Sequence, residues 1–176
     1  SSIYIDNNLI FGTEKITETL LDYKFYISPT SFFQVNTLQA EKLYEIALGY
    51  ANISNEDIVL DLYCGTGTIG LLASKNAKEV VGIELNNEAI KDANLNKALN
   101  NVSNIEFYAG DVGKILNKKK YQPNIVIVDP PRAGLDSLAI SEIIKINPET
   151  LVYVSCDLMT LARDLNILSN NFEICE

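Results

Sequence analysis

Residues 58–70 combine side chains and a glycine turn that could bind a small ligand. Their apolar run predicts a buried strand, and the glycine spacing that begins with Gly65 and Gly67 fits the dinucleotide fingerprint. In that fingerprint a pyrophosphate lies on helix N–H groups, and an acid further on, here Glu84, binds a ribose. Asp61 favours a different ligand, because a carboxylate repels pyrophosphate and attracts an ammonium or a sulfonium. The residues therefore favour S-adenosylmethionine, with NAD and a purely structural turn as alternatives.

A second group follows the apolar run at 125–128 and reads Asp129-Pro130-Pro131-Arg132. Two prolines cannot continue a central strand, so the backbone must leave the sheet and hold Asp129 at its rim. A carboxylate and an arginine fixed there suit a base edge and a phosphate respectively. A plain turn is the alternative interpretation.

The third candidate is Cys156, which ends another apolar run and precedes a helix that contains Arg163. A free cysteine is more often a buried hydrophobe than a nucleophile. Its position after a strand, ahead of a helix N-terminus and near Arg132 or Arg163, favours a reactive thiolate, whereas Asp157 works against one. Cys156 is therefore a candidate nucleophile.

The composition limits the classes of protein to which the chain can belong. The chain has 176 residues, 47% of them hydrophobic, which suffices for one α/β domain with its own core. The absence of histidine excludes Ser-His-Asp and Cys-His catalysis and His-ligated metal sites. A formal charge of −9 argues against unaided, non-specific binding to nucleic acid. No apolar run reaches the length of a membrane span, and the three cysteines are widely spaced, so we expect a cytoplasmic protein. We also expect a monomer.

From residue 58 onward, strand-like and helix-like segments alternate. Strands are expected at Ile58–Tyr63, Glu79–Glu84, Ile105–Ala109, Ile125–Asp129 and Thr150–Ser155. Helices are expected at Thr68–Lys75, Glu88–Asn100, Ser137–Ile146 and Met159–Leu168, with a short one near Val112–Asn117. This alternation predicts an α/β, Rossmann-like fold with a mostly parallel sheet, helices on both faces, and ligands at the carboxyl ends of the strands.

The N-terminal region has a different pattern. Residues 1–27 predict two or three antiparallel strands, too few for a core of their own, so we interpret them as the end of a preceding domain. Residues 28–176 form the expected main domain, in which a helix runs from Asn36 or Thr37 to about Tyr50. The expected apolar face of this helix consists of Leu38, Leu43, Ile46, Ala47 and Tyr50. Residues 172–176 read as the start of a sixth strand, so the sheet is expected to be incomplete at its C-terminal side.

Four motifs in order resemble the catalytic domain of the RNA uracil-5-methyltransferases, enzymes that use S-adenosylmethionine to make 5-methyluridine in ribosomal or transfer RNA. They are Ser28-Pro29 with Phe32-Phe33-Gln34-Val35-Asn36, Asp61-Leu62-Tyr63-Cys64-Gly65-Thr66-Gly67, Asp129-Pro130-Pro131-Arg132, and Ser155-Cys156 with Thr160-Leu161-Ala162-Arg163-Asp164. The resemblance covers nearly the whole chain from Ser28 onward and implies a methyltransferase fold.

The resemblance also implies roles for single residues. Cys156 would be the nucleophile, and addition of its thiolate at uracil C6 would make C5 reactive toward a methyl group. Phe32 or Phe33 would stack on the extruded base, with burial in the core as the alternative for either. Glu84 would bind the ribose hydroxyls. The resemblance also implies that the cofactor site includes Gln34, Tyr63 and Asp129, with Asp111 near the adenine. These residues add to Asp61, Gly65 and Gly67, which the glycine turn itself indicates.

The chain departs from the family pattern at three points. Asp157-Leu158 stands where the family has Asn-Pro. An RNA-binding barrel, most of a central domain and the cysteines some members use for an iron-sulfur cluster are missing, and the glutamate that resembles a general base would lie beyond residue 176. We expect a fragment, incomplete for turnover, of an enzyme that methylates uridine C5 in 23S ribosomal RNA. The alternatives are a tRNA uracil-5-methyltransferase, a base N-methyltransferase with an acid-Pro-Pro motif, and a non-catalytic module that binds the cofactor or RNA.

Overall fold

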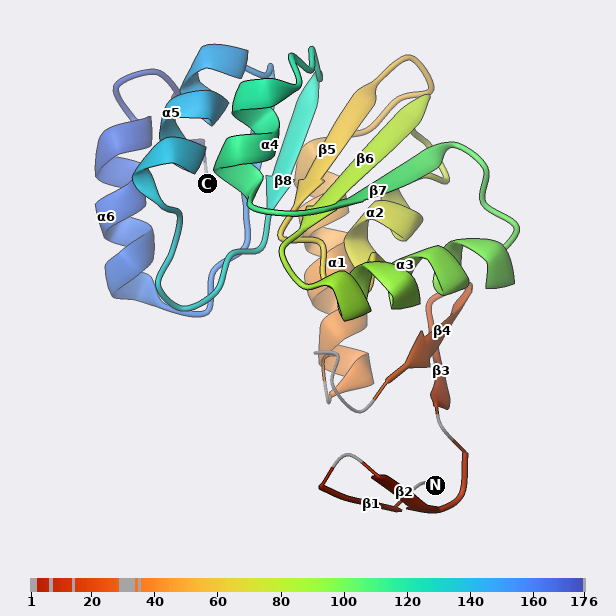
Figure 1. Cartoon of the computed structure of the whole chain (residues 1–176). Coiled ribbons are helices and arrows are strands. Elements are labelled where there is room, and N and C mark those ends of the chain that lie inside the picture. The colour runs from red at the N-terminus through yellow and green to blue at the C-terminus, as the bar shows by residue number, and fades with distance from the viewer. Residues whose placement is uncertain (1–2, 7, 14, 29–33, 35, 176) are drawn as a thin grey trace.

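A five-stranded parallel sheet forms the centre of the molecule (Figure 1). The structure is a computed structural model that describes residues 3–6, 8–13, 15–28, 34 and 36–175. The strands are β5 (Ile58–Leu62), β6 (Glu79–Glu84), β7 (Ile105–Ala109), β8 (Ile125–Val128) and β9 (Thr150–Tyr153), in the order β7-β6-β5-β8-β9. The strand order reverses between β5 and β8, and open α/β sheets bind ligands outside the carboxyl ends of their strands at such a reversal.

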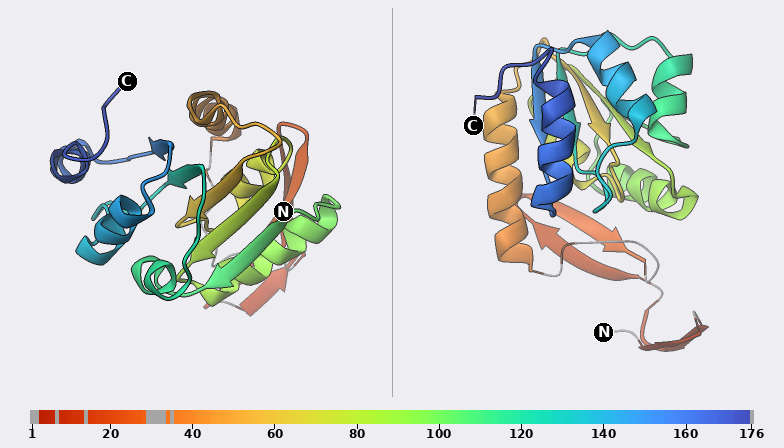
Figure 2. Two further views of the ribbon diagram at one scale, coloured as in Figure 1. Left: turned by 90° about the horizontal axis from the view of Figure 1, so that it is seen from above. Right: turned by 90° about the vertical axis from the view of Figure 1, so that its left-hand side faces the viewer.

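Helices cover both faces of this sheet (Figure 2), as the sequence predicts. The helices are α1 (Thr37–Ala51), α2 (Thr68–Ala73), α3 (Asn87–Leu99), α4 (Val112–Lys118), α5 (Ser137–Ile146) and α6 (Leu158–Leu168). Val59 packs in one core with α1 and α2, whereas Leu60 and Leu62 pack in a second core with α4, α5 and α6. Because side chains alternate along a strand, Asp61 points to the side of α2.

Three strands end earlier than predicted at their carboxyl ends. Tyr63 leaves β5 because its φ of 64° belongs to the left-handed region. Asp129 leaves β8 ahead of the two prolines. Ser155 leaves β9 because its Oγ accepts a hydrogen bond from the backbone N–H of Asp157 at 3.1 Å and forms a turn. The residues that leave the sheet early are therefore those of the predicted site and its neighbours.

The apolar face predicted for α1 is right at Ala47 and at Leu43, which packs against the core, and wrong at the other three positions, although the helix bounds are close to the expected ones. Asn36 caps the helix by accepting a hydrogen bond from the N–H of Gln39 at 3.2 Å. The side chains at the contact with the body are Ala40, Tyr44, Ala47 and Ala51, whereas Leu38, Ile46 and Tyr50 are exposed. These four residues, spaced four, three and four apart, lie on one face of the helix, and the three alanines among them let it approach β9 closely. Residues 172–175 form no strand, contrary to the prediction.

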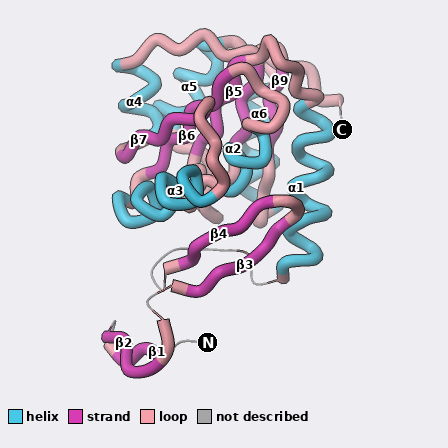
Figure 3. The backbone as a smooth tube through the Cα atoms, turned by 90° about the vertical axis from the view of Figure 1, so that its right-hand side faces the viewer, coloured by secondary structure: helices cyan, strands magenta, loops and turns pink. Residues whose placement is uncertain are grey.

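The N-terminal region forms two hairpins, with four strands instead of two or three. They are β1 (Ile3–Ile5) with β2 (Asn8–Phe11), and β3 (Ile16–Leu20) with β4 (Tyr23–Ile27). Figure 3 shows the first hairpin away from the body and the second beside α1 and α3. Leu20 and Phe25 are fully buried in the core that contains α1 and α2. Within the described residues, none of the helices has the length and apolar character needed to cross a membrane.

Candidate cofactor and catalytic site

Most of the predicted site residues lie at the carboxyl ends of four neighbouring strands. In the sheet order, Glu84 ends β6, the turn at 63–67 follows β5, Asp129 follows β8 and Cys156 follows β9. Backbone hydrogen bonds continue past the strand ends, since the N–H of Asp129 donates to the carbonyl of Leu62 at 3.3 Å. The fold therefore collects an acid, a glycine turn, a second acid and a thiol along one edge.

Asp61 is a fully buried carboxylate beside this edge. Its Oδ2 accepts a hydrogen bond from the N–H of Gly70 at 2.7 Å, and a Cβ at Gly70 would lie 2.8 Å from that oxygen. Its Oδ1 is buried and has no hydrogen-bond partner among the described residues. Burial raises the pKa of Asp61 to about 8, with further contributions from the charges of Asp129 and Glu84 and an opposing one from the Gly70 hydrogen bond.

Two further carboxylates face the same region. Burial raises the pKa of Asp129 to about 6. Glu84 accepts a hydrogen bond from the N–H of Gly65 at 3.2 Å and another from the N–H of Asn86 at 2.8 Å, so it fastens the glycine turn to the end of β6. Together with Asp61, these side chains make the site electronegative.

The turn itself presents a second buried polar atom without a partner. Gly67 closes the turn by donating its N–H to the carbonyl of Cys64 at 2.8 Å. The hydroxyl of Tyr63 is buried and finds no hydrogen-bond partner in the described part of the chain. Burial, with the charge of Asp136 next, raises the pKa of Tyr63 above its usual range. Orphaned polar groups at a strand end are places where a bound ligand would supply the missing partner.

The structure gives less support to the roles predicted for four other residues. Asp111 caps α4, because its carboxylate accepts a hydrogen bond from the N–H of Lys114 at 2.9 Å, and its place near an adenine stays a prediction. Gln34 is half-buried, with its role also untested. Phe32 and Phe33 lie outside the described residues.

Cys156 has an exposed thiol immediately before α6. Asp157 caps this helix, since its Oδ1 accepts hydrogen bonds from the N–H groups of Met159 and Thr160, both at 3.0 Å. The Thr160 N–H bond above all lowers the pKa of Asp157, and the charge of Arg132 adds to this effect. The carboxylate that the sequence places against the thiol is thus bonded to the helix end, and Arg132, whose charge acts on Asp157, is exposed.

Arg163, which the sequence suggests as a second cation for the thiol, is engaged elsewhere. Its guanidinium bonds the fully buried carboxylate of Asp164 and donates to the carbonyl of Ala133 at 2.8 Å. Asp164 also accepts hydrogen bonds from the Tyr153 hydroxyl at 2.7 Å and from the N–H of Leu135 at 2.8 Å. This cluster, which sequence reasoning missed, anchors the loop that follows Arg132 onto α6.

The anchor requires glycine at position 134. Gly134 has a φ of 74°, and a Cβ there would lie 2.5 Å from Asp164 Oδ2 and 2.6 Å from an Arg163 guanidinium nitrogen. Gly134→Ala should therefore lower the free energy of unfolding by about 1–3 kcal/mol in denaturant titrations. Gly49→Ala is the matched control, because no atom lies within 4 Å of its Cβ position in α1, and it should be neutral or stabilising. Equal stability of Gly134→Ala and wild type would contradict the anchoring role.

Comparisons with known proteins agree with this geometry. A Clostridium tetani protein named an uncharacterized RNA methyltransferase is 46% identical over 169 residues, which cover 96% of this chain and 37% of that protein. A similarly named Clostridium acetobutylicum protein is 50% identical over 159 residues, covering 90% of this chain and 35% of that protein.

A solved structure extends the match to three dimensions. The Pyrococcus abyssi tRNA (uracil-54, C5)-methyltransferase, in complex with S-adenosyl-L-homocysteine, matches with a TM-score of 0.78 at 35% identity, over 89% of this chain and 38% of that one. The chain spans between 35% and 38% of the length of these three relatives. Residues 1–176 match the family described as tRNA (uracil-5-)-methyltransferase, and the chain belongs to that family.

Proposed function

We propose that this chain is the catalytic part of an enzyme that methylates C5 of uridine in RNA with S-adenosylmethionine. The observation that carries the proposal is the placement of an exposed cysteine, Cys156, on the same sheet edge as the carboxylates of Asp61, Glu84 and Asp129. The Pyrococcus relative, named for this reaction on tRNA, supports it.

The residues present fit this cofactor better than a dinucleotide. S-adenosylmethionine supplies an electrophilic methyl group on a sulfonium and also carries an ammonium. The acidic side chains of Asp61, Glu84 and Asp129 suit these positive charges, which favour the ionised forms of Asp61 and Asp129, and they would repel a pyrophosphate. The buried, unpartnered Oδ1 of Asp61 and hydroxyl of Tyr63 offer hydrogen-bonding positions in the described part of the site. Glu84, at the end of β6, is placed to accept hydrogen bonds from ribose hydroxyls.

Cys156 explains how a methyl group can be added to C5, a carbon atom of uracil. Uracil C5 is a poor nucleophile, so the Cys156 thiolate forms a bond to C6, and the electrons of the C5–C6 double bond move toward C5 and the C4 carbonyl oxygen. C5 would then form a bond to the sulfonium's methyl carbon, and the electron pair of the broken S–CH3 bond would stay on sulfur as a neutral thioether. Loss of the C5 proton to a base restores the double bond and expels the thiolate.

Asp129 and Arg132 are proposed to position the base and its nucleotide. With a pKa of about 6, Asp129 can exchange a proton near neutral pH and hydrogen-bond the uracil edge in either state. Exposed Arg132 can pair with a phosphate of the RNA. Stacking of the base on Phe32 or Phe33 stays a prediction.

Replacement of Glu84 tests the cofactor site. Glu84→Ala should weaken binding of S-adenosylmethionine in calorimetry by about 1–3 kcal/mol, the cost of losing charge-assisted hydrogen bonds. Glu79→Ala is the matched control, because Glu79 is an exposed acid at the opposite end of the same strand. Wild-type affinity in Glu84→Ala would remove Glu84 from the site, and equal binding of NAD by the wild type would refute the choice of cofactor.

The RNA substrate has two candidates. We expect 23S ribosomal RNA from the sequence, whereas the Pyrococcus relative named for tRNA favours transfer RNA. Methyl incorporation into equimolar ribosomal and transfer RNA transcripts, followed by mapping of 5-methyluridine, decides between them. Methylation at an exocyclic nitrogen in either RNA would instead identify a base N-methyltransferase.

A further inference from the structure

Two polar side chains of α3 and that of its C-cap, Asn100, form a ladder along the free edge of β4. Asn100 accepts a hydrogen bond from the N–H of Lys24 at 2.9 Å and donates to its carbonyl at 2.7 Å. Asn96 does the same to Tyr26, at 2.6 Å and 3.3 Å. Asp92 accepts a hydrogen bond from the N–H of the next alternate residue, Ser28, at 3.3 Å.

The two spacings match for a geometric reason. Residues four apart on a helix are separated by about 6 Å along its axis, and residues two apart on a strand by nearly 7 Å. Side chains at every fourth helix position can therefore meet backbone groups at every second strand position. The ladder forms the hydrogen bonds that a neighbouring strand would form. It therefore covers a strand edge that could otherwise pair with another strand.

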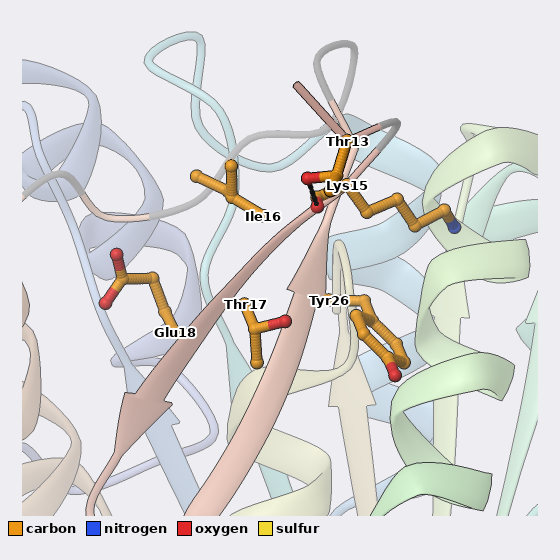
Figure 4. Close-up of a pocket in the computed structure, with 6 residues that line it drawn as sticks. All are labelled: Thr13, Lys15, Ile16, Thr17, Glu18 and Tyr26. Atoms are coloured by element: carbon orange, nitrogen blue, oxygen red, sulfur yellow. Dashed lines mark hydrogen bonds between the residues drawn. The ribbon is translucent and has the colours of Figure 1, made fainter. Parts of the chain in front are cut away.

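The ladder ends at Ser28. Asp92 also accepts hydrogen bonds from the Ser28 hydroxyl at 2.8 Å and from the Lys15 ammonium. Figure 4 shows Tyr26 on β4 and Lys15 just before β3, at a hollow that is also lined by Thr13, Ile16, Thr17 and Glu18. None of the predicted site residues lines that hollow. The ladder, and not the hollow, is what connects the hairpin to the site.

Asn96 makes one contact that sets it apart from Asn100. Its amide nitrogen also donates to the carbonyl of Thr66 at 3.2 Å, inside the turn between Cys64 and Gly67. The Asn96 side chain is fully buried, and so is nearly all of Thr66. One side chain thus joins strand β4 to the glycine turn, across 70 residues of sequence on one side and 30 on the other.

We propose that Asn96 is a positioning residue that sets the glycine turn in register with β4, so that the hairpin and the turn respond together to the cofactor. The proposal rests on the cofactor function proposed for the turn. Because coupling between two sites is reciprocal, a ligand that stabilises the turn also stabilises the hydrogen bonds of Tyr26.

Amide hydrogen exchange on the wild-type chain tests the coupling without a mutation. Addition of S-adenosyl-L-homocysteine should slow exchange of the Tyr26 N–H more than that of the Lys24 N–H, which Asn100 holds. Equal protection of both, or protection of the turn with no change at Tyr26, would overturn the proposal.

Matched variants supply the second test. Asn96→Asp and Asn100→Asp each keep the acceptor and lose the donor, but only the first releases Thr66. Asn96→Asp should weaken binding of S-adenosyl-L-homocysteine about tenfold and abolish the extra protection of Tyr26, whereas Asn100→Asp should change affinity less than about twofold. Equal affinities of the two variants would reject the role of Asn96. Failure of the wild type to bind would instead reject the cofactor assignment, and if Asn96→Asp does not fold, the exchange experiment decides alone.

Discussion

Replacement of Cys156 with alanine should abolish methylation of uridine and leave cofactor binding unchanged. Without the thiolate, C5 cannot be made nucleophilic, so we expect the rate of methyl transfer to fall by at least about 1,000-fold. Cys156 is exposed, and it is not one of the residues that hold the glycine turn in place. Transfer of a radiolabelled methyl group to RNA measures the activity, and calorimetry measures the cofactor affinity.

Cys175→Ala is the control for this experiment. Cys175 is also free and exposed, but it follows α6 and lies outside the strand ends that form the site. Its replacement should leave the rate within about twofold of wild type. Substantial activity in Cys156→Ala, or an equal loss in both variants, would show that Cys156 is not the nucleophile.

The second large effect is expected from Asp61→Asn, which should stabilise the protein and impair cofactor binding. Between the ordinary pKa of 3.8 and the raised value of about 8, folded Asp61 holds a proton that the unfolded chain has released. The unfolded state then binds fewer protons, so stability falls as pH rises through this window. Asparagine keeps the oxygen that accepts the Gly70 hydrogen bond and has no charge to bury.

Melting curves and calorimetry test both parts of this prediction. The free energy of unfolding of Asp61→Asn should exceed that of wild type by on the order of 1–3 kcal/mol at pH 8, and by less at pH 5. Binding of S-adenosylmethionine should weaken about tenfold at pH 8, and binding of S-adenosyl-L-homocysteine, which has no sulfonium charge, should weaken less. A destabilised variant, or equal losses for the two ligands, would contradict the account of Asp61.

The sequence was sufficient to predict the sheet, both helix layers and the edge that holds the site. Alternating apolar runs and helix caps are local signals, so the cores of strands β5 to β9 and the start of α1 at Thr37 were predictable. The ends of β5 and β9 were not predictable, because Tyr63 and Ser155 continue an extended pattern although their backbone turns away from the sheet. The two prolines after Asp129 did signal the end of β8, to within one residue.

The packing between segments was less predictable. Large apolar residues on α1 suggested a face that the structure leaves exposed, since close approach to β9 selects alanines instead. The polar residues at positions 92 and 96 of α3 and at its C-cap, position 100, carried a signal, a spacing of four along one face. Their partners lie 64 to 76 residues away, so no local pattern could identify them.

Trapping of the covalent adduct tests the central claim most directly. In an RNA that carries 5-fluorouridine, C5 has no proton for a base to remove, so a thiolate added at C6 cannot leave after methyl transfer. Incubation of this RNA with the chain and S-adenosylmethionine, followed by intact-mass and peptide mass spectrometry, should show a methylated nucleotide adduct on the peptide that contains Cys156. An adduct on another residue, an adduct that persists in Cys156→Ala, or methylation of ordinary uridine with no adduct from the fluorinated RNA would contradict the proposed mechanism.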